Sequence, residues 1–547
     1  MDTQPQFGRI RNILWPIASF ELKKFIPMVV MIFFIATNYN LLKIVKDSTV
    51  VPALGAEVLP FVKVWMMLPM AVLMTAFFSA LVKIFNENRA FYIILSLFLS
   101  YFILFVFVIY PNRQFFNLDM IADFLLQYLP AGGKGFATMI RSWYLGIFYT
   151  MCELWSTTVL FVLFWGFANR TTPLHEAKRF YALFGLAGNS SGIFAPVFFN
   201  WASNISIFPR WYLKSNWEQT LGIVCVAVLA SGLITTAIYY YLNNWVIDHK
   251  TTSASSNGFA KKKKKHSSFI DSMKMLAKNP YVRNLTIVVL SYNIIINLTE
   301  IIWKDQIRLL YPNPSDYGHY FGKVMMVTGV MATLSDLLVC SNVIRRFGWT
   351  SAAMVTPMIL LFTSIGFFGF ILFDSYFESF LVHLLGLSPL ALTAFFGSMQ
   401  NAMARASKYS LFDATKEIAF IPLDPESRIQ SKAAIDGVCS RLGKSGGAVI
   451  YQGLFMTVGS LGACIPYVAA IVGAIMVLWI NAVKQMGIKF NLLTQERERD
   501  QLHSDEVLLD NEESPASVHT PAPVPTSVTP SAPAPASVAS AKSGAMA

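Results

Sequence analysis

The chain has 547 residues, of which 55% are hydrophobic and only 14% charged, and its formal net charge is +12. Soluble domains carry roughly 25% charged residues, so this composition excludes a soluble globular protein and indicates a polytopic membrane protein. The positive charge is typical of basic cytoplasmic loops rather than of nucleic-acid binding. The 5 cysteines and 7 histidines show no metal or redox spacing, so neither a metal nor a cofactor is expected.

Apolar runs long enough for a hydrocarbon layer of roughly 30 Å recur along the chain and predict about twelve membrane-spanning helices. Six are expected in the first half, at 25–45, 58–82, 91–110, 143–168, 178–203 and 219–246. Six are expected in the second half, at 281–303, 318–344, 350–373, 380–404, 431–458 and 463–483. The predicted fold is an all-α polytopic membrane protein with two pseudo-symmetric six-helix halves.

Lysine and arginine are concentrated in the N-terminal segment, the even-numbered connections and the centre, which places both termini in the cytoplasm. The first 24 residues show neither a cleavable signal nor a transit peptide, which favours a bacterial inner membrane over a plastid envelope. The predicted order is a cytoplasmic N-terminus, an N-terminal half, a basic cytoplasmic linker, a C-terminal half and a disordered Pro/Ala/Ser-rich tail. Their limits are 1–24, 25–247, 248–280, 281–489 and 490–547.

The first predicted span contains charges that are costly to bury and should face protein or a watery cavity. Asn40, Lys43 and Asp47 share one helical face, and Lys46 lies close to it. Two structural alternatives remain open. Lys43 could simply pair with Asp47, and Lys46 could extend to the external interface.

Two further spans carry isolated carboxylates. Glu153 lies in an otherwise uncharged run, so it is either half of a buried ion pair or protonated, as proton coupling would require. Glu300 precedes Lys304 by four residues, which is the favourable order for a helical ion pair. Asn293 and Asn297 add a polar strip of the kind that lines aqueous pathways.

The stretch Lys432–Gly447 is the most unusual part of the chain, because it brings four charges into a predicted span. If it is one helix, a small-residue side that includes Asp436 and Gly443 lets another helix approach closely. The neighbouring side presents Arg441 and Lys444 to an anion. The partner that neutralises Asp436 is left open.

A nucleotide-hydrolysing loop is excluded at Gly443-Lys444-Ser445. The P-loop motif requires glycine five residues before Gly443, where Val438 stands, and no β-strand precedes the segment. Gly188–Gly192 in the fifth span and Gly443–Gly447 in the eleventh instead form a weak repeat between the halves. Such repeats point to a substrate site between the halves.

Motifs spread from about residue 10 to residue 490 carry a family resemblance. They are Asn38-Tyr39, Lys46-Asp47, Glu153-Leu-Trp155, Phe164-Trp-Gly-Phe-Ala-Asn169, Glu176-Ala-Lys-Arg-Phe-Tyr-Ala-Leu-Phe-Gly185, Ile296-Asn-Leu-Thr-Glu300, Asn342-Val-Ile-Arg-Arg-Phe-Gly-Trp349, Lys408-Tyr-Ser-Leu-Phe-Asp413, Ile421-Pro-Leu-Asp424 and Lys432–Gly447. With them the chain resembles the non-mitochondrial ATP/ADP translocases, the nucleotide transporters of plastids and of obligate intracellular bacteria such as chlamydiae and rickettsiae.

The resemblance implies a transporter similar to the major facilitator fold, which works by alternating access without hydrolysis and is not an enzyme. It implies essential charges at Lys46, Glu153 and Glu300, and at either Lys444 or Lys432. We favour Lys444, because Lys432 lies nearer the cytoplasmic end of its span and can extend out of it.

One departure from the family pattern concerns the transport mode. Family members that exchange ATP for ADP often read Arg-Asp-Thr-Lys-Asp where this chain reads Lys43-Ile-Val-Lys-Asp47. Proton-coupled import of several nucleoside triphosphates therefore stays open beside exchange.

The predicted site is a cavity that binds polyphosphate mainly with Lys46 and Lys444. The other candidate cations are Arg441, Lys43 and Lys432, and Arg405 and Lys408 could attract polyanions to the cavity mouth. The candidate gating or coupling carboxylates are Glu153, Glu300 and Asp436. The candidates for base or ribose contacts are Tyr39, Tyr149, Trp155, Tyr292, Asn293 and Asn297, although lone aromatic residues in spans more often serve packing.

The expected partners are ATP, ADP and related nucleoside triphosphates, membrane lipid and, in the coupled version, protons. Nucleic acid is not expected, and the chain is taken to be a monomer. Two other classes of function have less support. A membrane enzyme would need a nucleophile with a base or a metal cluster, and none is visible in the sequence. A scaffold would not need matched charges in both halves.

Overall fold

The computed structural model describes residues 17–246, 279–338, 340–374, 376, 386–423 and 425–513. Within these ranges every regular element is helical. The predicted basic linker lies almost wholly outside the described residues, as does the tail from residue 514. Some side chains on described helices also lie outside the description, including those of Arg441 and Lys444. The described residues up to Leu492 form one compact unit, and those from Leu493 to Glu513 belong to a second.

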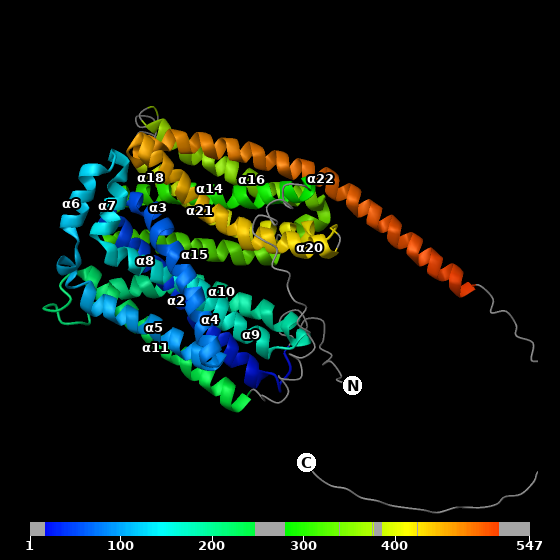
Figure 1. Ribbon diagram of the computed structural model, residues 1–547, viewed down its shortest axis with the longest axis horizontal. Coiled ribbons are helices and arrows are strands. Elements are labelled where there is room, and N and C mark those ends of the chain that lie inside the picture. The colour runs from blue at the N-terminus through cyan, green and yellow to red at the C-terminus, as the bar shows by residue number, and fades with distance from the viewer. Residues whose placement is uncertain are drawn as a thin grey trace, which may run out of the picture. The chain divides into compact units, whose positions relative to one another are not determined.

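Most helices of the N-terminal half lie in the lower part of the unit in Figure 1. Its helices are α2 (Leu22–Leu54), α3 (Leu59–Phe61), α4 (Leu68–Ile84), α5 (Glu87–Leu104), α8 (Trp143–Trp155), α9 (Trp165–Thr171), α10 (Leu174–Ser203) and α11 (Asn216–Tyr241). Wider π-helical segments, η2 (Val62–Met67) and η6 (Ser156–Phe164), join α3 to α4 and α8 to α9. The connection between α5 and α8 contains α6 (Asp119–Tyr128) and α7 (Lys134–Arg141), which lie at the left of the unit in Figure 1, level with helices of the C-terminal half.

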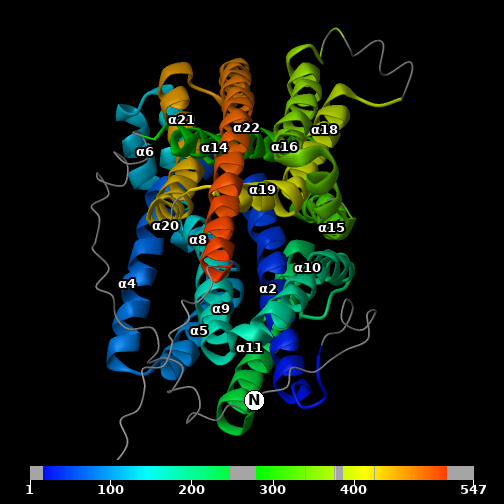
Figure 2. The same ribbon diagram turned by 90° about the vertical axis from the view of Figure 1, so that its right-hand side faces the viewer.

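The C-terminal half lies above it in the same view. Its helices are α14 (Pro280–Leu310), α15 (Pro314–Leu338), α16 (Cys340–Leu372), α18 (Pro389–Ser407), α19 (Asp413–Ala419), α20 (Pro425–Lys432), α21 (Ser440–Val458) and α22 (Leu461–Glu513). Two π-helical segments, η8 (Lys408–Phe412) and η9 (Ala433–Cys439), connect α18 to α19 and α20 to α21. Figure 2 shows α2 lying between helices of both halves.

Nine helical runs among the described residues are long and apolar enough to cross a membrane, and they coincide with nine of the predicted spans. The predicted spans at 318–344, 380–404 and 431–458 are also occupied by helices, namely α15, α18 and α21. These three helices are shorter or more polar and are not among the nine. The polytopic all-helical fold is confirmed, whereas the count of twelve spans stays a prediction.

Helix α22 continues to Glu513, beyond the predicted start of the disordered tail at residue 490. The segment from residue 490 to residue 513 is rich in Glu, Gln, Arg and Leu, which are strong helix formers, and it contains neither Gly nor Pro. Low hydrophobicity predicted disorder there, but the local helix propensity favours continuation of the span helix.

The two halves pack directly against each other at the end of the unit where α2 finishes, here called the closed end. The side-chain amide of Gln452 on α21 donates to the carbonyl of Pro60 on α3, at 3.0 Å. The backbone amide of Leu461 donates to the carboxylate of Glu57, also at 3.0 Å. Both contacts join segments of opposite halves.

Helices α10 and α15 contact each other across the boundary between the halves. Gly192 and Gly329 meet so closely that a Cβ added at Gly192 would lie 3.8 Å from the Cα of Gly329. Further toward the closed end, a Cβ added at Gly318 would lie 2.5 Å from the ring of Phe199. Small residues at such positions let two membrane helices approach backbone to backbone.

The first prediction concerns Gly132, which precedes α7 at the closed end. A Cβ added there would lie 1.6 Å from the carbonyl oxygen of Phe455 in the other half, so the backbones must separate. We expect Gly132→Ala to lower the free energy of unfolding in detergent by about 1–3 kcal/mol, the usual cost of overpacking. Gly453→Ala on α21 is the matched control, because its added Cβ meets no atom within 4 Å. Equal stability of the two variants would contradict this account.

Candidate functional site

A chain of ion pairs crosses the middle of the unit and joins the two halves; we call it the central ion chain. In the N-terminal half, Lys46 on α2 lies 3.2 Å from Asp47 and 3.0 Å from Glu153 on α8. In the C-terminal half, Lys304 on α14 lies 3.0 Å from Glu300, and Arg405 on α18 lies 3.5 Å from Glu300. The two parts meet where Lys304 lies 2.9 Å from Asp47.

Burial makes these pairs mutually dependent. The side chain of Lys46 is 1% exposed, that of Asp47 0% and that of Lys304 2%. An uncompensated buried charge costs several kcal/mol, so each of these three groups needs its partners. The ring of Tyr149 lies 3.9 Å from the ammonium of Lys46 and adds a cation–π contact. One carboxylate oxygen of Asp47 receives the ammonium groups of both lysines.

The structure selects among the alternatives left open by the sequence. Lys46 does not extend to an interface but is buried against two carboxylates. Glu153 is paired, as the structural alternative held, and Glu300 pairs with Lys304 as its spacing predicted. The alternative pairing of Lys43 with Asp47 is not found, because Asp47 binds Lys46 and Lys304.

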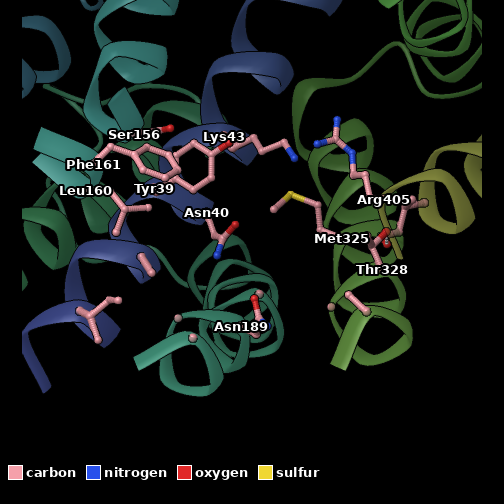
Figure 3. Close-up of a pocket in the computed structure, with 18 of the residues that line it drawn as sticks. Tyr39, Asn40, Lys43, Ser156, Leu160, Phe161, Asn189, Met325, Thr328 and Arg405 are labelled. Atoms are coloured by element: carbon pink, nitrogen blue, oxygen red, sulfur yellow. Dashed lines mark hydrogen bonds between the residues drawn. The ribbon is translucent and has the colours of Figure 1, made fainter. Parts of the chain in front are cut away.

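A cavity of about 320 Å³ lies between the halves, on the side of the central ion chain away from the closed end. Cavities of roughly this volume hold small-molecule ligands. Lys43 projects into it from α2, and Arg405 faces Lys43 from the C-terminal half (Figure 3). Among the side chains that the structure describes, none forms a hydrogen bond or ion pair with Lys43.

The cavity wall beside Lys43 is aromatic and polar. Tyr39, one helical turn before Lys43 on α2, and Phe161 on η6 lie on the same side of the cavity (Figure 3). Phe161 is 60% exposed although it is a large apolar side chain. Asn40 and Asn189 contribute amides to the same wall, and Asn40 also donates to the hydroxyl of Ser191.

Three of the predicted base-contact residues lie in the protein core rather than on the cavity wall. Trp155 is 0% exposed and donates to the carbonyl of Ile35. Tyr292 is buried and donates to the carbonyl of Ala404, and Tyr149 is buried beneath Lys46. Hydrophobic burial explains these positions, so Tyr39 is the predicted aromatic residue that reaches the cavity.

The polar strip on α14 packs against the glycine side of α21. Added Cβ atoms at Gly443 and Gly447 would lie 2.6 Å and 2.8 Å from the Cβ atoms of Asn293 and Asn297. Close approach of another helix to this glycine side, predicted from sequence, is confirmed. The two asparagines therefore lie in a helix–helix contact rather than along an open pathway.

Asp436, whose partner the sequence left open, pairs with Lys416 of α19 at 2.7 Å. Burial alone lowers the pKa of Lys416, but the hydrogen bond and charge of Asp436 raise that pKa above its ordinary value. Lys432 is half exposed and pairs with Glu417, outside the cavity wall. Arg441 and Lys444 belong to α21 by their backbone, and their side chains lie outside the described set.

Two cations of this region were missing from the predicted site. Lys63 donates to the side-chain oxygen of Asn297 at 3.0 Å, which links η2 to α14. Its sequence signal was a lysine inside an apolar run. Arg405 was assigned to the mouth because it follows the predicted span 380–404, but α18 continues to Ser407 and brings it to the cavity.

Comparison with known proteins decides the family. The family model of the TLC ATP/ADP transporters matches residues 1–490. The chain belongs to this family. It is 39% identical to ADP,ATP carrier protein 1 of Chlamydia trachomatis over 90% of this chain and 94% of that protein. It is 36% identical to ADP,ATP carrier protein 1 of Rickettsia bellii over 90% of this chain and 98% of that protein.

A plastid relative and a solved structure extend the comparison of this TLC family member. The chain is 37% identical to the chloroplastic ADP,ATP carrier protein 2 of Arabidopsis thaliana over 87% of this chain and 76% of that protein. A bacterial homologue of the iron transporter ferroportin has a similar fold, with a TM-score of 0.51 at 13% identity. That likeness covers 85% of this chain and 100% of the other. The protein is therefore a multi-pass membrane transporter of major-facilitator-like fold, not an enzyme.

The second prediction tests the link that Asp47 forms between the halves. We expect Asp47→Asn to lower the free energy of unfolding in detergent by about 3 kcal/mol, near the lower limit for breaking a buried ion pair. The loss is not larger because Lys46 and Lys304 each keep a second carboxylate.

The matched control is Asp305→Asn, which breaks a pair with Arg308 on the same helix. Arg308 is 33% exposed, so this loss should stay within about 1 kcal/mol. Chemical denaturation followed by tryptophan fluorescence measures both variants. An equal loss of unfolding free energy in the two variants would show that the Asp47–Lys304 bridge stabilises the protein no more than the ion pair within one helix.

Proposed function

We propose that this TLC family member exchanges ATP for ADP across a bacterial cell membrane, by alternating access and without hydrolysis, with both termini in the cytoplasm. The observation that carries the proposal is the cavity between the halves, where Lys43 and Arg405 face each other and Lys43 has no described ion-pair partner. A polyanion supplies the missing negative charge. The names of the curated relatives, ADP,ATP carrier proteins, support ATP and ADP as the polyanions.

Phosphate recognition at this pair follows from the chemistry of the two cations. Arg405 offers a planar guanidinium that can bind two phosphate oxygens at once, while Lys43 acts as a mobile point charge. Lys46 is the next cation along α2, and it becomes available to phosphate only when its pairs with Asp47 and Glu153 loosen. Lys444 and Arg441 remain proposed contributors on the basis of the family resemblance.

Binding is then an exchange of ion-pair partners. A phosphate that takes Arg405 from Glu300 leaves Glu300 free to hold Lys304 more strongly, because that carboxylate no longer shares two cations. Lys304 in turn holds Asp47, which is the link between the halves. Substrate binding can therefore change the balance between the two orientations, since it favours one set of pairs over the other.

The nucleoside end of the substrate fits the aromatic wall. Tyr39 lies four residues before Lys43, about 6 Å along the helix axis, so a base beside Tyr39 keeps its phosphates near Lys43. Phe161 offers a second ring face on the same wall. Stacking on aromatic rings is the usual way to hold a nucleobase without a fixed sequence of hydrogen bonds.

A second candidate function is proton-coupled import of several nucleoside triphosphates. Glu153 favours it, since its side chain is 32% exposed beside the buried Lys46 and could take up a proton when Lys46 moves to phosphate. The altered face Lys43-Ile-Val-Lys-Asp47 is consistent with either mode.

The third prediction separates the two modes. Purified protein in liposomes should take up labelled ATP, and ADP loaded inside should stimulate uptake strongly, whereas a protonophore should leave uptake unchanged. The opposite pattern, with protonophore sensitivity and no effect of internal ADP, would select proton-coupled import. If no nucleotide enters under either condition, the proposal of nucleotide transport fails.

The fourth prediction tests the aromatic wall. Phe161→Leu should raise the KM for ATP about 5- to 150-fold, because base–aromatic stacking is worth roughly 1–3 kcal/mol. Inhibition by inorganic triphosphate, which has no base, should be unchanged, and Phe161→Trp should keep the wild-type KM. Phe362→Leu on α16, an exposed ring outside the cavity, is the matched control. Equal loss of affinity for ATP and inorganic triphosphate would remove Phe161 from base binding.

A further inference from the structure

The charges around the cavity do not balance. The charged side chains described in the central ion chain and beside the cavity comprise five cations and three carboxylates. The cations are Lys43, Lys46, Lys63, Lys304 and Arg405, and the carboxylates are Asp47, Glu153 and Glu300. Glu300 alone has four cations as electrostatic neighbours, namely Lys304, Lys63, Arg405 and Lys43. The described part of the site therefore carries an excess of positive charge when it holds no substrate.

Among the described side chains the two excess positive charges are those of Lys63 and Lys43, because neither pairs with a carboxylate, and Lys43 is the one that lines the cavity. The three carboxylates are occupied by Lys46, Lys304 and Arg405. Lys63 has the amide oxygen of Asn297 as a partner. The ammonium of Lys43 projects into the cavity, and Arg405 of the other half faces it across that cavity (Figure 3).

We propose that this uncompensated Lys43, opposite Arg405, prevents the empty carrier from changing orientation and so makes nucleotide exchange obligatory. The inference rests on the proposed function. In the described structure Lys43 is only partly buried and lines the cavity, so it keeps access to solvent while the cavity is open. Alternating access requires a state in which both ends of the cavity are closed. In that state water is excluded, and the ammonium of Lys43 loses its hydration without gaining a negative partner, which costs free energy.

Repulsion adds to this cost. Lys43 belongs to α2 of one half and Arg405 to α18 of the other, so closing the cavity brings two like charges together in a medium of low dielectric constant. A nucleotide with several negative charges removes both penalties at once. Only the nucleotide-bound carrier then passes easily through the state in which both ends are closed. One nucleotide must therefore leave for each that enters.

The test compares net efflux with exchange in liposomes loaded with labelled ATP. Wild-type protein should release label slowly into a medium without nucleotide and quickly into a medium with ADP. Lys43→Gln should raise the ratio of net efflux to exchange by about tenfold or more, because the unpaired charge is gone. Lys43→Arg, which keeps the charge, should retain the low ratio, and Lys83→Gln at an exposed position is the control for expression and leakage.

A second variant leaves Lys43 in place. Asn40 lies three residues before Lys43 on the cavity wall, so Asn40→Asp adds a carboxylate that can pair with Lys43. Asn40→Asp should therefore also raise the ratio of net efflux to exchange. Spin labels on the exposed residues Leu186 of α10 and Leu334 of α15 report cavity closure without any flux. In substrate-free protein, both variants should add a population with a shorter label distance that the wild type lacks.

The outcomes separate this inference from the proposed function. If the wild type shows no ADP-stimulated efflux, nucleotide exchange itself fails. If the wild type exchanges but its net efflux is equally fast, Lys43 does not lock the empty carrier. The inference is also overturned if both variants keep the wild-type ratio and the wild-type distance distribution.

Discussion

The carboxylate of Asp47 is the group on which the arrangement of the two halves depends. One of its oxygens receives Lys46 from its own helix and Lys304 from the other half, at 3.2 Å and 2.9 Å. All three side chains are almost completely buried, so none can lose its partners without a cost of several kcal/mol. The contacts described at the closed end are hydrogen bonds from Gln452 to a backbone carbonyl and from a backbone amide to the carboxylate of Glu57, together with close packing at Gly132, and none of them is an ion pair. The strength of the bridge between Asp47 and the two lysines, in contrast, changes strongly when an anion approaches, because it is an interaction between charges.

This bridge is connected to the cavity by alternating charges. Arg405 reaches Glu300, Glu300 reaches Lys304, Lys304 reaches Asp47, and the chain ends in Lys46 and Glu153. Each member shares its partner with the next, so withdrawal of one charge redistributes the rest. Under the proposed alternating access, this coupling converts binding in the cavity into a change in the strength of the Asp47–Lys304 link.

Sequence reasoning reached the buried charges because a charge inside an apolar run is visible without a structure. It found Lys46, Glu153 and Glu300 and the glycine side of α21, since helical periodicity determines which residues share a side. It could not find the pairing of Asp47 with Lys304, because these residues lie 257 positions apart and only packing of the halves brings them together. The same limit applies to the aromatic residues. Periodicity gives the side of a helix on which Trp155 and Tyr292 lie, but not whether that side faces core or cavity.

Helix α2 explains how one rigid element can serve binding and coupling together. Tyr39, Lys43 and Asp47 follow at intervals of four residues, so they line one face over about 12 Å. The ring and Lys43 contact the cavity, whereas Asp47 contacts the other half. Because a helix does not stretch, a substrate that displaces the Lys43 end also displaces Asp47 relative to Lys304. Under the proposed function, the spacing on this helix ties the position of a nucleotide at Lys43 to the bridge between Asp47 and Lys304.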